Sequence, residues 1–196
     1  MPTTVICVSH ADGAGGAEVA RLVTERLGYR YADDEIVARA ARDAGLYPEA
    51  LALAESREAG RRVEVDFGRF ENTDKLRDLI CAAIVTTAND GPVVIGAHAA
   101  SFALLGRPDV LRVLVTASDG TRERRIAEGE GLDAKAAAKV LKESDKGRAS
   151  YIKQFYDVDR ELPTHYDLVV NTDVLDAATA VEAIVTAADA AALSPA

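Results

Sequence analysis

The chain has 196 residues, 48% of them hydrophobic, so it is long enough to bury one sizeable core, and we expect a single domain over residues 1–196. Its 32 acidic residues outnumber 23 basic ones and give a formal net charge of −9. Because a nucleic-acid-binding surface normally presents a basic stripe, this balance disfavours nucleic acid as a partner and favours a small molecule.

The two cysteines, Cys7 and Cys81, are each surrounded by apolar residues, which favours reduced core thiols over a disulfide framework. The sequence contains no grouping of ligand residues that suggests a metal cluster. The amino terminus has no basic segment followed by an apolar one, and no apolar run reaches the roughly 18 residues of a membrane span. We therefore expect a cytoplasmic protein with no metal cluster and no membrane partner.

The first informative segment is VICVSHADGAGG, residues 5–16, which predicts a buried strand, a glycine-rich loop and the start of a helix. At such a junction, nucleoside-triphosphate enzymes bind phosphate. Glycines at positions 13, 15 and 16, with Ala14 among them, permit a turn whose backbone N–H groups converge on an anion. A plain strand-to-helix turn, in which Gly13, Gly15 and Gly16 only allow close packing, is the alternative interpretation.

The full phosphate-loop pattern G-x-x-x-x-G-K-[ST], placed on residues 10–17, matches this chain only at Gly15. His10 replaces the first glycine, Gly16 replaces the lysine, and Ala17 replaces the hydroxyl residue that binds magnesium. The loop thus has the shape of a phosphate site without its usual cation. His10 either supplies part of the missing positive charge or is a simple loop histidine.

Further along the chain, short apolar runs alternate with helical periods, which indicates an α/β fold with a parallel sheet covered on both faces. The strand-like runs are residues 4–8, 29–31, 92–96, 111–116 and 167–171. Helices are predicted at 35–44, 48–60 and 73–89, and they form a mostly helical excursion suited to a substrate-side cap. Asp33 follows the second strand at the carboxyl edge of the sheet, where it can orient a substrate hydroxyl or a magnesium-bound water.

A second excursion follows the fourth strand, and Asp119 and Asp133 are predicted to cap its two helices. The spacing of Lys135, Lys139, Lys142 and Lys146 places their ammonium groups on one side of the second helix. For the first three lysines, a solvated charged face is the favoured interpretation. Beyond that helix we expect a mobile connection that carries Lys146, Arg148 and Lys153 together with tyrosines. An arginine there can bind phosphate through two hydrogen bonds, so Arg148 and Lys146 are our candidate catalytic cations.

Several segments, in this order, resemble the cytidylate kinase-like proteins, which are relatives of nucleoside monophosphate kinases. They are SHADGAGGAEVARLVTERLGYRYADDEIVARAA, PVVIGAHAA, RPDVLRVLVTA, DKGRASYIKQFYDVD and HYDLVVNTD. The resemblance implies a P-loop nucleotide-kinase fold, with three α/β/α layers around a five-stranded parallel sheet. It also implies a helical cap at about residues 34–90 over the acceptor, and a lid at about residues 119–160 over the donor phosphates.

This chain departs from that family at the positions of its cations. Relatives that lack the loop lysine typically carry serine-arginine after the first strand and an arginine after Gly-Gly, where this chain has Ser9-His10 and Ala17. The third strand usually ends in Gly-Arg and here ends in Gly96-Ala97. The remaining candidates are the lid cations Lys146, Arg148 and Lys153, with Arg122, Arg124 and Arg125 on the preceding helix.

Two functional hypotheses follow. The first is a phosphotransferase that moves the γ-phosphoryl group of ATP, with magnesium, to a small acceptor such as a nucleoside monophosphate. The second is a catalytically impaired relative that binds a nucleotide or another anion as a regulatory protein, which the losses at Gly16, Ala17 and Ala97 favour. A structural role for the alanine-rich carboxyl-terminal helix is weaker, because Leu175, Ala178, Val181, Val185 and Ala188 form an ordinary core-facing stripe.

Overall fold

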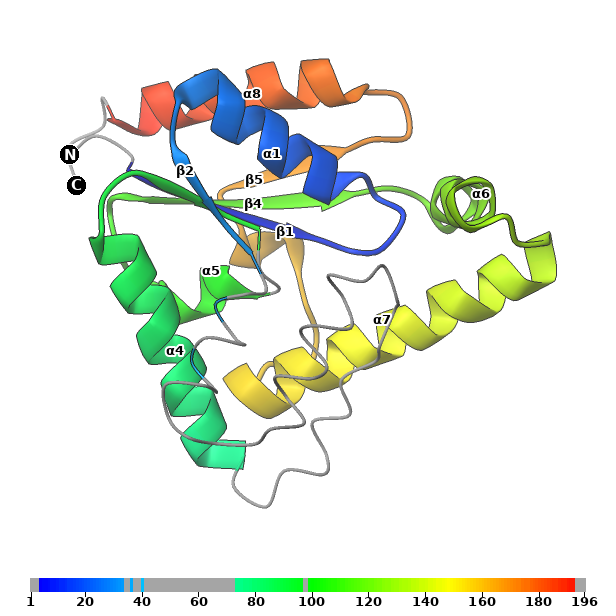
Figure 1. Cartoon of the computed structure of the whole chain (residues 1–196), viewed down its shortest axis with the longest axis horizontal. Helices are drawn as coiled ribbons and strands as arrows, with labels where there is room; N and C mark the ends of the chain where they lie inside the picture. Colours follow the sequence, from blue (N-terminus) through cyan, green and yellow to red (C-terminus); the bar gives the residue numbers. More distant parts are fainter. Residues whose placement is uncertain (1–3, 34–35, 37–39, 41–72, 97–98, 193–196) are drawn as a thin grey trace.

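The computed structural model describes residues 4–33, 36, 40, 73–96 and 99–192 of the chain. Five strands form one parallel sheet in the order β2-β3-β1-β4-β5, so the first strand lies at its centre (Figure 1). The strands are β1 (Val5–His10), β2 (Arg30–Ala32), β3 (Val93–Ile95), β4 (Val110–Thr116) and β5 (Leu168–Asn171).

Helices cover both faces of this sheet. On one face lie α1 (Gly16–Leu27) and α8 (Ala177–Ala192), and on the other lie α4 (Thr73–Asn89), α5 (Ala100–Ala103) and the carboxyl-terminal end of α7 (Ala134–Tyr156). Side chains of β1 alternate between the two faces: Ile6 and Val8 pack toward α1 and α8, whereas Val5 and Cys7 pack toward α4. The predicted three-layer α/β/α architecture around a five-stranded parallel sheet is therefore confirmed.

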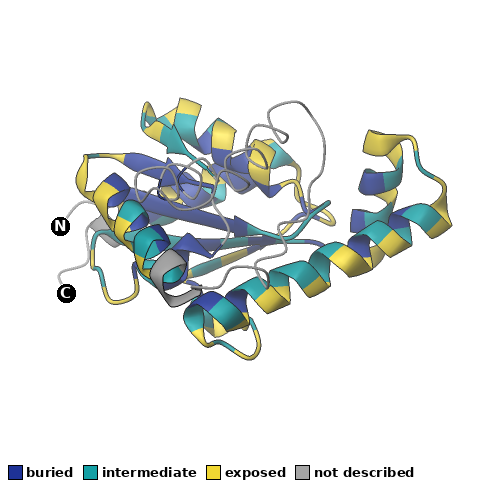
Figure 2. Cartoon of the chain, turned by 60° about the horizontal axis from the view of Figure 1, so that its bottom comes forward, coloured by how far each residue is buried: buried dark blue, intermediate teal, exposed yellow. Residues whose placement is uncertain are grey.

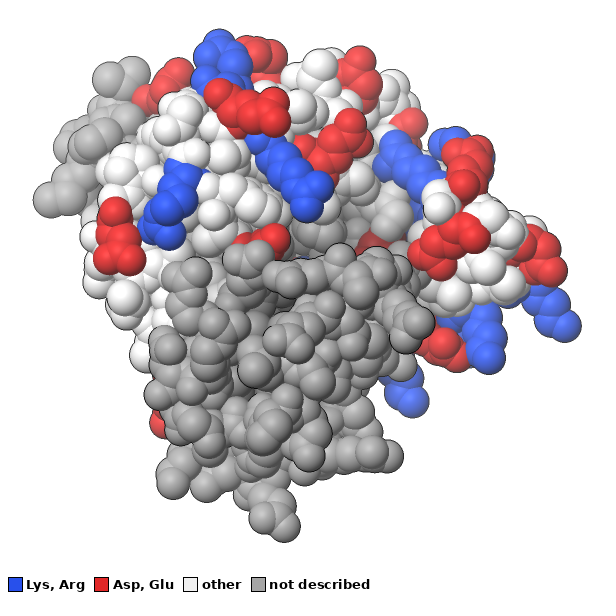
Figure 3. All heavy atoms as spheres, in the orientation of Figure 1, with Lys and Arg blue, Asp and Glu red and all other residues white. Residues whose placement is uncertain are grey.

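An arm formed by α6 (Asp119–Glu130) and the first part of α7 projects from the sheet (Figure 2). Buried Ile126, Ala137 and Leu141 join the two helices in a small core of their own. The four lysines of the predicted stripe on α7 are all exposed, and basic atoms gather at the lower right of Figure 3, where this arm lies. Among the described residues, no helix is both long and apolar enough to cross a bilayer.

Most predicted boundaries agree with the structure to within two residues. The helix predicted at 73–89 is α4, and Gly28 ends α1 in the left-handed conformation, with φ at 65°. The helices expected at 35–44 and 48–60 lie outside the described residues, except that Ile36 and Ala40 are described and buried. The proposed cap therefore stays a prediction.

Three sequence expectations need correction. Ser118 caps α6, because its extended backbone lets its hydroxyl accept a hydrogen bond from the N–H of Thr121, whereas Asp119 is already helical. Asp133 does cap α7 as predicted. The cationic segment expected on a connection is helical instead, since α7 continues to Tyr156 and ends at Asp157 with φ at 54°.

The third correction concerns the carboxyl-terminal stripe. Leu175 precedes α8 and is 38% exposed, and Ala178 faces solvent. Val181, Val185 and Ala188 are buried as predicted, and Ala180 and Ile184 complete the buried side of α8, because the helix begins only at Ala177 and this start sets which side meets the sheet.

Candidate phosphate-binding site

The loop at residues 11–15 joins the carboxyl end of central strand β1 to the amino-terminal end of α1. Gly13 and Gly15 both have positive φ, at 75° and 77°, and Gly15 is the N-cap of α1. A Cβ on Gly13 would lie 2.7 Å from the carbonyl oxygen of Arg122. Ala14 is fully buried, and its N–H donates to the carbonyl of Ala11 at 3.1 Å. The loop is thus closely packed against α6, and Gly13 permits that approach.

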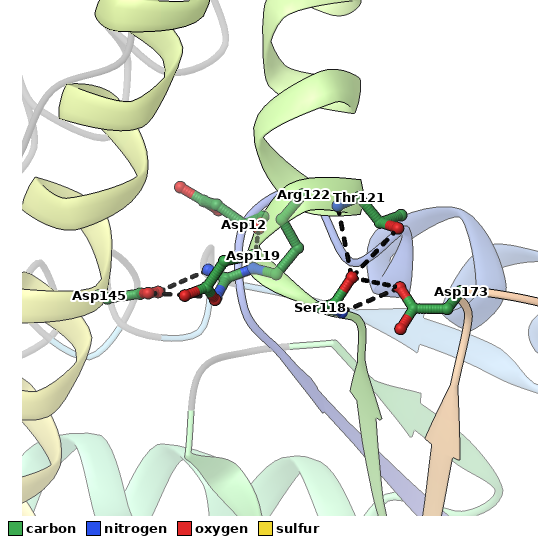
Figure 4. Close-up of polar contacts among 7 residues, drawn as sticks. All are labelled: Asp12, Ser118, Asp119, Thr121, Arg122, Asp145 and Asp173. Atoms are coloured by element: carbon green, nitrogen blue, oxygen red, sulfur yellow. Dashed lines mark hydrogen bonds and ion pairs between the residues drawn. The ribbon is translucent and has the colours of Figure 1, made fainter.

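Arg122 of α6 ties the loop to α7 (Figure 4). Its side chain is only 7% exposed, and its Nε donates to the carbonyl of Asp12 at 2.7 Å. Both terminal nitrogens bind the carboxylate of Asp145 on α7, at 3.1 and 2.5 Å, and Asp119 lies 3.6 Å away. The hydroxyl of Ser144 donates to the carboxylate of Asp12 at 2.6 Å. These contacts fasten the middle of α7 to the loop.

Arg125, one turn further along α6, binds the other end of the loop. Its Nη1 donates to the carbonyl of Gly13 at 3.3 Å and to the hydroxyl of Thr172 at 2.9 Å, and its Nη2 donates to the carbonyl of Thr172 at 2.7 Å. The Thr172 hydroxyl in turn donates to the carbonyl of Ala14 at 2.8 Å. The structure therefore places Arg125 against one backbone carbonyl of the predicted phosphate loop and joins it to Thr172.

Arg148 of α7 lies at the start of the loop, where its Nη1 donates to the carbonyl of His10 at 3.0 Å. Its Nε and Nη2 bind the two carboxylate oxygens of Glu161 at 2.8 and 2.5 Å, and the hydroxyl of Tyr166 also donates to Glu161. The side chains of Arg148 and Glu161 are 11% and 20% exposed. Burial alone would raise the pKa of Glu161, but the hydrogen bonds and charge of Arg148 outweigh it and lower that pKa.

A pocket of about 300 Å³ lies between the loop, α7 and the segment that follows α7. Its charged lining consists of three arginines and three acids: Arg122, Arg148, Arg160, Asp145, Asp159 and Glu161. Two of these arginines are paired with acids inside the pocket, and Asp159 binds Lys153 at 2.7 Å. Within the described parts of the chain, Arg160 makes no ion pair.

The remaining predicted cations do not join Arg148 in this pocket. Lys146 is exposed and lies two residues before Arg148, about 200° around the helix. Lys153 binds Asp157 at 2.8 Å as well as Asp159, and these hydrogen bonds raise its pKa above the usual range. The structure thus brings together Arg148 and the loop, but neither lysine.

Asp33 lies just after β2, an edge strand separated from β1 by β3, and its carbonyl accepts a hydrogen bond from the N–H of Ile36 at 2.9 Å. Its predicted role on the acceptor side stays a prediction. Ala97 at the acceptor end lies outside the described residues. Among the residues that are described, no group of three or more His, Cys, Asp or Glu side chains is arranged to hold a metal ion.

Sequence reasoning missed three contributors to this site. Thr172 binds the loop from the end of β5, and Glu161 pairs with Arg148. Ser144 binds the Asp12 carboxylate from α7. Only Thr172 carried a signal, as a polar residue just after a predicted strand. Partners such as Glu161 have no such signal, because they lie in an irregular segment.

His10, the last residue of β1, packs its side chain over Gly16, the first residue of α1. A Cβ built on Gly16 would lie 2.2 Å from the Cβ of His10 and 2.5 Å from its Cγ. The chain departs from the phosphate-loop pattern at both positions, with His10 for glycine and Gly16 for lysine. The side chain of His10 fills the space that a side chain at position 16 would need.

Comparison with solved structures reveals the same fold in proteins of very different sequence. A crystal structure of an uncharacterized protein from Eubacterium ventriosum has a TM-score of 0.71 at 20% identity, covering 94% of this chain and 98% of that one. Shikimate kinase from Acinetobacter baumannii in complex with shikimate has a TM-score of 0.56 at 14% identity, covering 99% and 96%. At such identities the likeness concerns the fold alone.

Sequence relatives point to a narrower group. A cytidylate kinase of Staphylothermus marinus is 26% identical over 172 residues, which cover 87% of this chain and 88% of that protein. One from Natronomonas pharaonis is 29% identical over 169 residues, which cover 86% and 80%. The model of the cytidylate kinase-like family matches residues 5–174, and the chain accordingly belongs to this family.

Proposed function

We propose that this protein is a phosphotransferase of the nucleotide-kinase type. An oxygen of a small acceptor such as a nucleoside monophosphate would attack the γ-phosphorus of ATP, and the bond to the β–γ bridging oxygen would break to release ADP. Family and fold support a nucleotide-kinase-like function. The observation that carries the proposal is the glycine loop at the end of the central strand, with the largely buried guanidinium of Arg148 bound to the carbonyl of His10, the residue just before the loop.

The loop backbone at Gly13, Ala14, Gly15 and Gly16 would bind the phosphates, since phosphate sites at helix amino termini use backbone N–H groups. Arg148 and His10 would supply side-chain donors beside it. The loop does not fit a protein-bound magnesium ion, because Ala17 has no oxygen where the pattern has a hydroxyl. We therefore assign no step to that ion, although the family implies ATP and magnesium.

A second candidate function is nucleotide or anion binding without turnover. It is favoured by one observation, namely that both buried arginines of the pocket already pair with carboxylates of the protein, Asp145 and Glu161. A single well-placed cation contributes a factor on the order of 1,000 to phosphoryl transfer. A site without the loop lysine, whose arginines are neutralised, would transfer slowly even if it bound ATP.

Calorimetric titration with ATP, together with a transfer assay on nucleoside monophosphates, separates these two functions. We expect Arg148→Ala to weaken ATP binding by about 1.5 to 3 kcal/mol, because hydrogen bonds to charged groups contribute that much. Arg148→Lys, which keeps the charge but not the two-pronged geometry, should lose part of this affinity.

Arg124→Ala is the matched control, because Arg124 on α6 is 60% exposed and forms an exposed ion pair with Glu128. Its affinity for ATP should equal that of the unmodified protein. If Arg148→Ala folds and binds ATP with unchanged affinity, Arg148 is no phosphate ligand. Binding without any transfer to an acceptor would support the second function over the first.

A further inference from the structure

The contact between His10 and Gly16 links two positions that define a phosphate loop. The separation of 2.2 Å from a Cβ at position 16 to the Cβ of His10 is far below any real carbon–carbon contact. The clash involves the first side-chain atom of each residue, so rotation of the histidine ring cannot relieve it. On this backbone, a side chain at position 16, including lysine, therefore fits only with glycine at position 10.

Backbone movement that relieves this clash is costly, because His10 is held from two directions. It belongs to β1 and is in register with Val115 of the neighbouring strand β4. Its carbonyl accepts the hydrogen bond from Arg148, whose guanidinium is itself fixed by Glu161. On the other side, Gly16 begins α1 directly after the left-handed N-cap Gly15.

We propose that the imidazole of His10 takes the place of the missing lysine as the phosphate-binding side chain of this loop. This inference rests on the proposed function, in that it assumes that the loop binds phosphate. The histidine side chain fills the space beside the first turn of α1 where the lysine would leave the backbone, and it is half-buried there. In either protonation state the ring carries at least one N–H donor, so it can bind a phosphate oxygen.

The steric part of the proposal is tested by thermal unfolding. Gly16→Ala should lower the melting temperature by about 4 to 8 °C, as overpacking does in a domain of this kind. In a His10→Gly background, Gly16→Ala should lower the melting temperature only slightly. Gly120→Ala is the control, because Gly120 lies in the first turn of α6 with open space around its missing Cβ. If Gly16→Ala lowers the melting temperature equally with His10 and with Gly at position 10, the steric link between the two positions is wrong.

The binding part is tested by titration with inorganic tripolyphosphate and with ATP. His10→Gly should weaken both by about tenfold, the loss expected for a hydrogen bond to a charged group. His10→Gln, which keeps an N–H donor, should lose less affinity for either anion than His10→Gly. The double variant His10→Gly/Gly16→Lys should regain the affinity, because the lysine then has room. Arg26→Gln, a change in the last turn of α1 at an exposed residue that pairs with Glu182, should have no effect.

The outcomes separate this inference from the proposed function. If His10→Gly or, should that variant not fold, His10→Ala binds tripolyphosphate as tightly as the unmodified protein, the role of His10 is wrong, while phosphoryl transfer can still be measured. If the His10 variants weaken binding but no acceptor is phosphorylated, the inference stands and the proposed transfer fails. If the unmodified protein binds neither anion, both are wrong.

Discussion

At the scale of single residues, Gly13 and Gly28 are both required for positive φ, but only Gly13 is also required for close packing. Gly13 has positive φ and lies where α6 approaches so closely that a Cβ would contact the backbone of Arg122 at 2.7 and 2.9 Å. Gly28 has nearly the same φ, at 65°, but nothing lies within 4 Å of its missing Cβ. A substitution at Gly28 therefore measures backbone strain alone, whereas a substitution at Gly13 measures strain together with steric overlap.

We expect Gly28→Ala to lower the free energy of unfolding by about 1 kcal/mol, the cost of left-handed backbone for a residue with a Cβ. Gly13→Ala should cost about 2 kcal/mol more, because the new methyl group also displaces α6. Denaturant unfolding followed by circular dichroism measures both values. Equal losses in the two variants would show that the contact at Arg122 relaxes freely.

At the scale of elements, α7 holds the site together. Ser144, Asp145 and Arg148 lie within about one helical turn of each other and bind the loop directly or through Arg122. The exposed lysines of the same helix make no such contacts to the loop. A long helix can thus carry a solvated face and a site-forming face, and the contacts to the loop decide which cations belong to the site.

Breaking the Arg148–Glu161 pair should destabilise the fold far more than breaking a surface pair does. Glu161→Ala leaves a largely buried guanidinium without its carboxylate, so we expect a loss of about 3 kcal/mol in the free energy of unfolding. Glu128→Ala, which breaks the exposed pair with Arg124, should cost less than about 0.5 kcal/mol. Urea unfolding of both variants measures the difference, and a loss at Glu161 as small as that at Glu128 would contradict it.

At the scale of the whole molecule, acidic residues outnumber basic ones, yet several of the described carboxylates are bound by arginines. The hydrogen bonds of Arg107 lower the pKa of Asp109. Burial by itself would raise the pKa of Asp167, but the hydrogen bonds of Arg112 outweigh it and lower that pKa. Like Glu161, these groups bind protons less readily in the folded protein than in the unfolded chain.

Because these folded-state pKa values lie below the unfolded ones, the associated stability is present above about pH 5 and is lost as the pH falls toward 3. We expect the melting temperature to be nearly constant between pH 6 and 7 and to fall steeply below about pH 4.5. The melting temperature of Asp167→Asn should fall less steeply with decreasing pH, since the substitution removes one of the titrating groups. Calorimetric scans between pH 7 and pH 3 measure these melting temperatures. A melting temperature that stays constant down to pH 3 would exclude the contribution of these ion pairs.

The sequence by itself determined the elements and the family. Strand and helix periods are local properties, so the five strands, α4, the end of α1 at Gly28 and the cap at Asp133 were predictable. The order of the motifs was sufficient to predict the cytidylate kinase-like family and its fold. The loop between β1 and α1 was likewise found from its glycines alone.

Only the tertiary structure decided which side chains meet at that loop. The carbonyl of His10 and the guanidinium of Arg148 are 138 positions apart in the chain, and nothing local distinguishes Arg148 from Lys146 as its partner. The pairing with Glu161 and the clash between His10 and a Cβ at position 16 depend on how α7 and α1 pack on the sheet. Periodicity fixes which side of an element is buried, but packing between distant elements fixes which charges are neutralised and which volume is already filled.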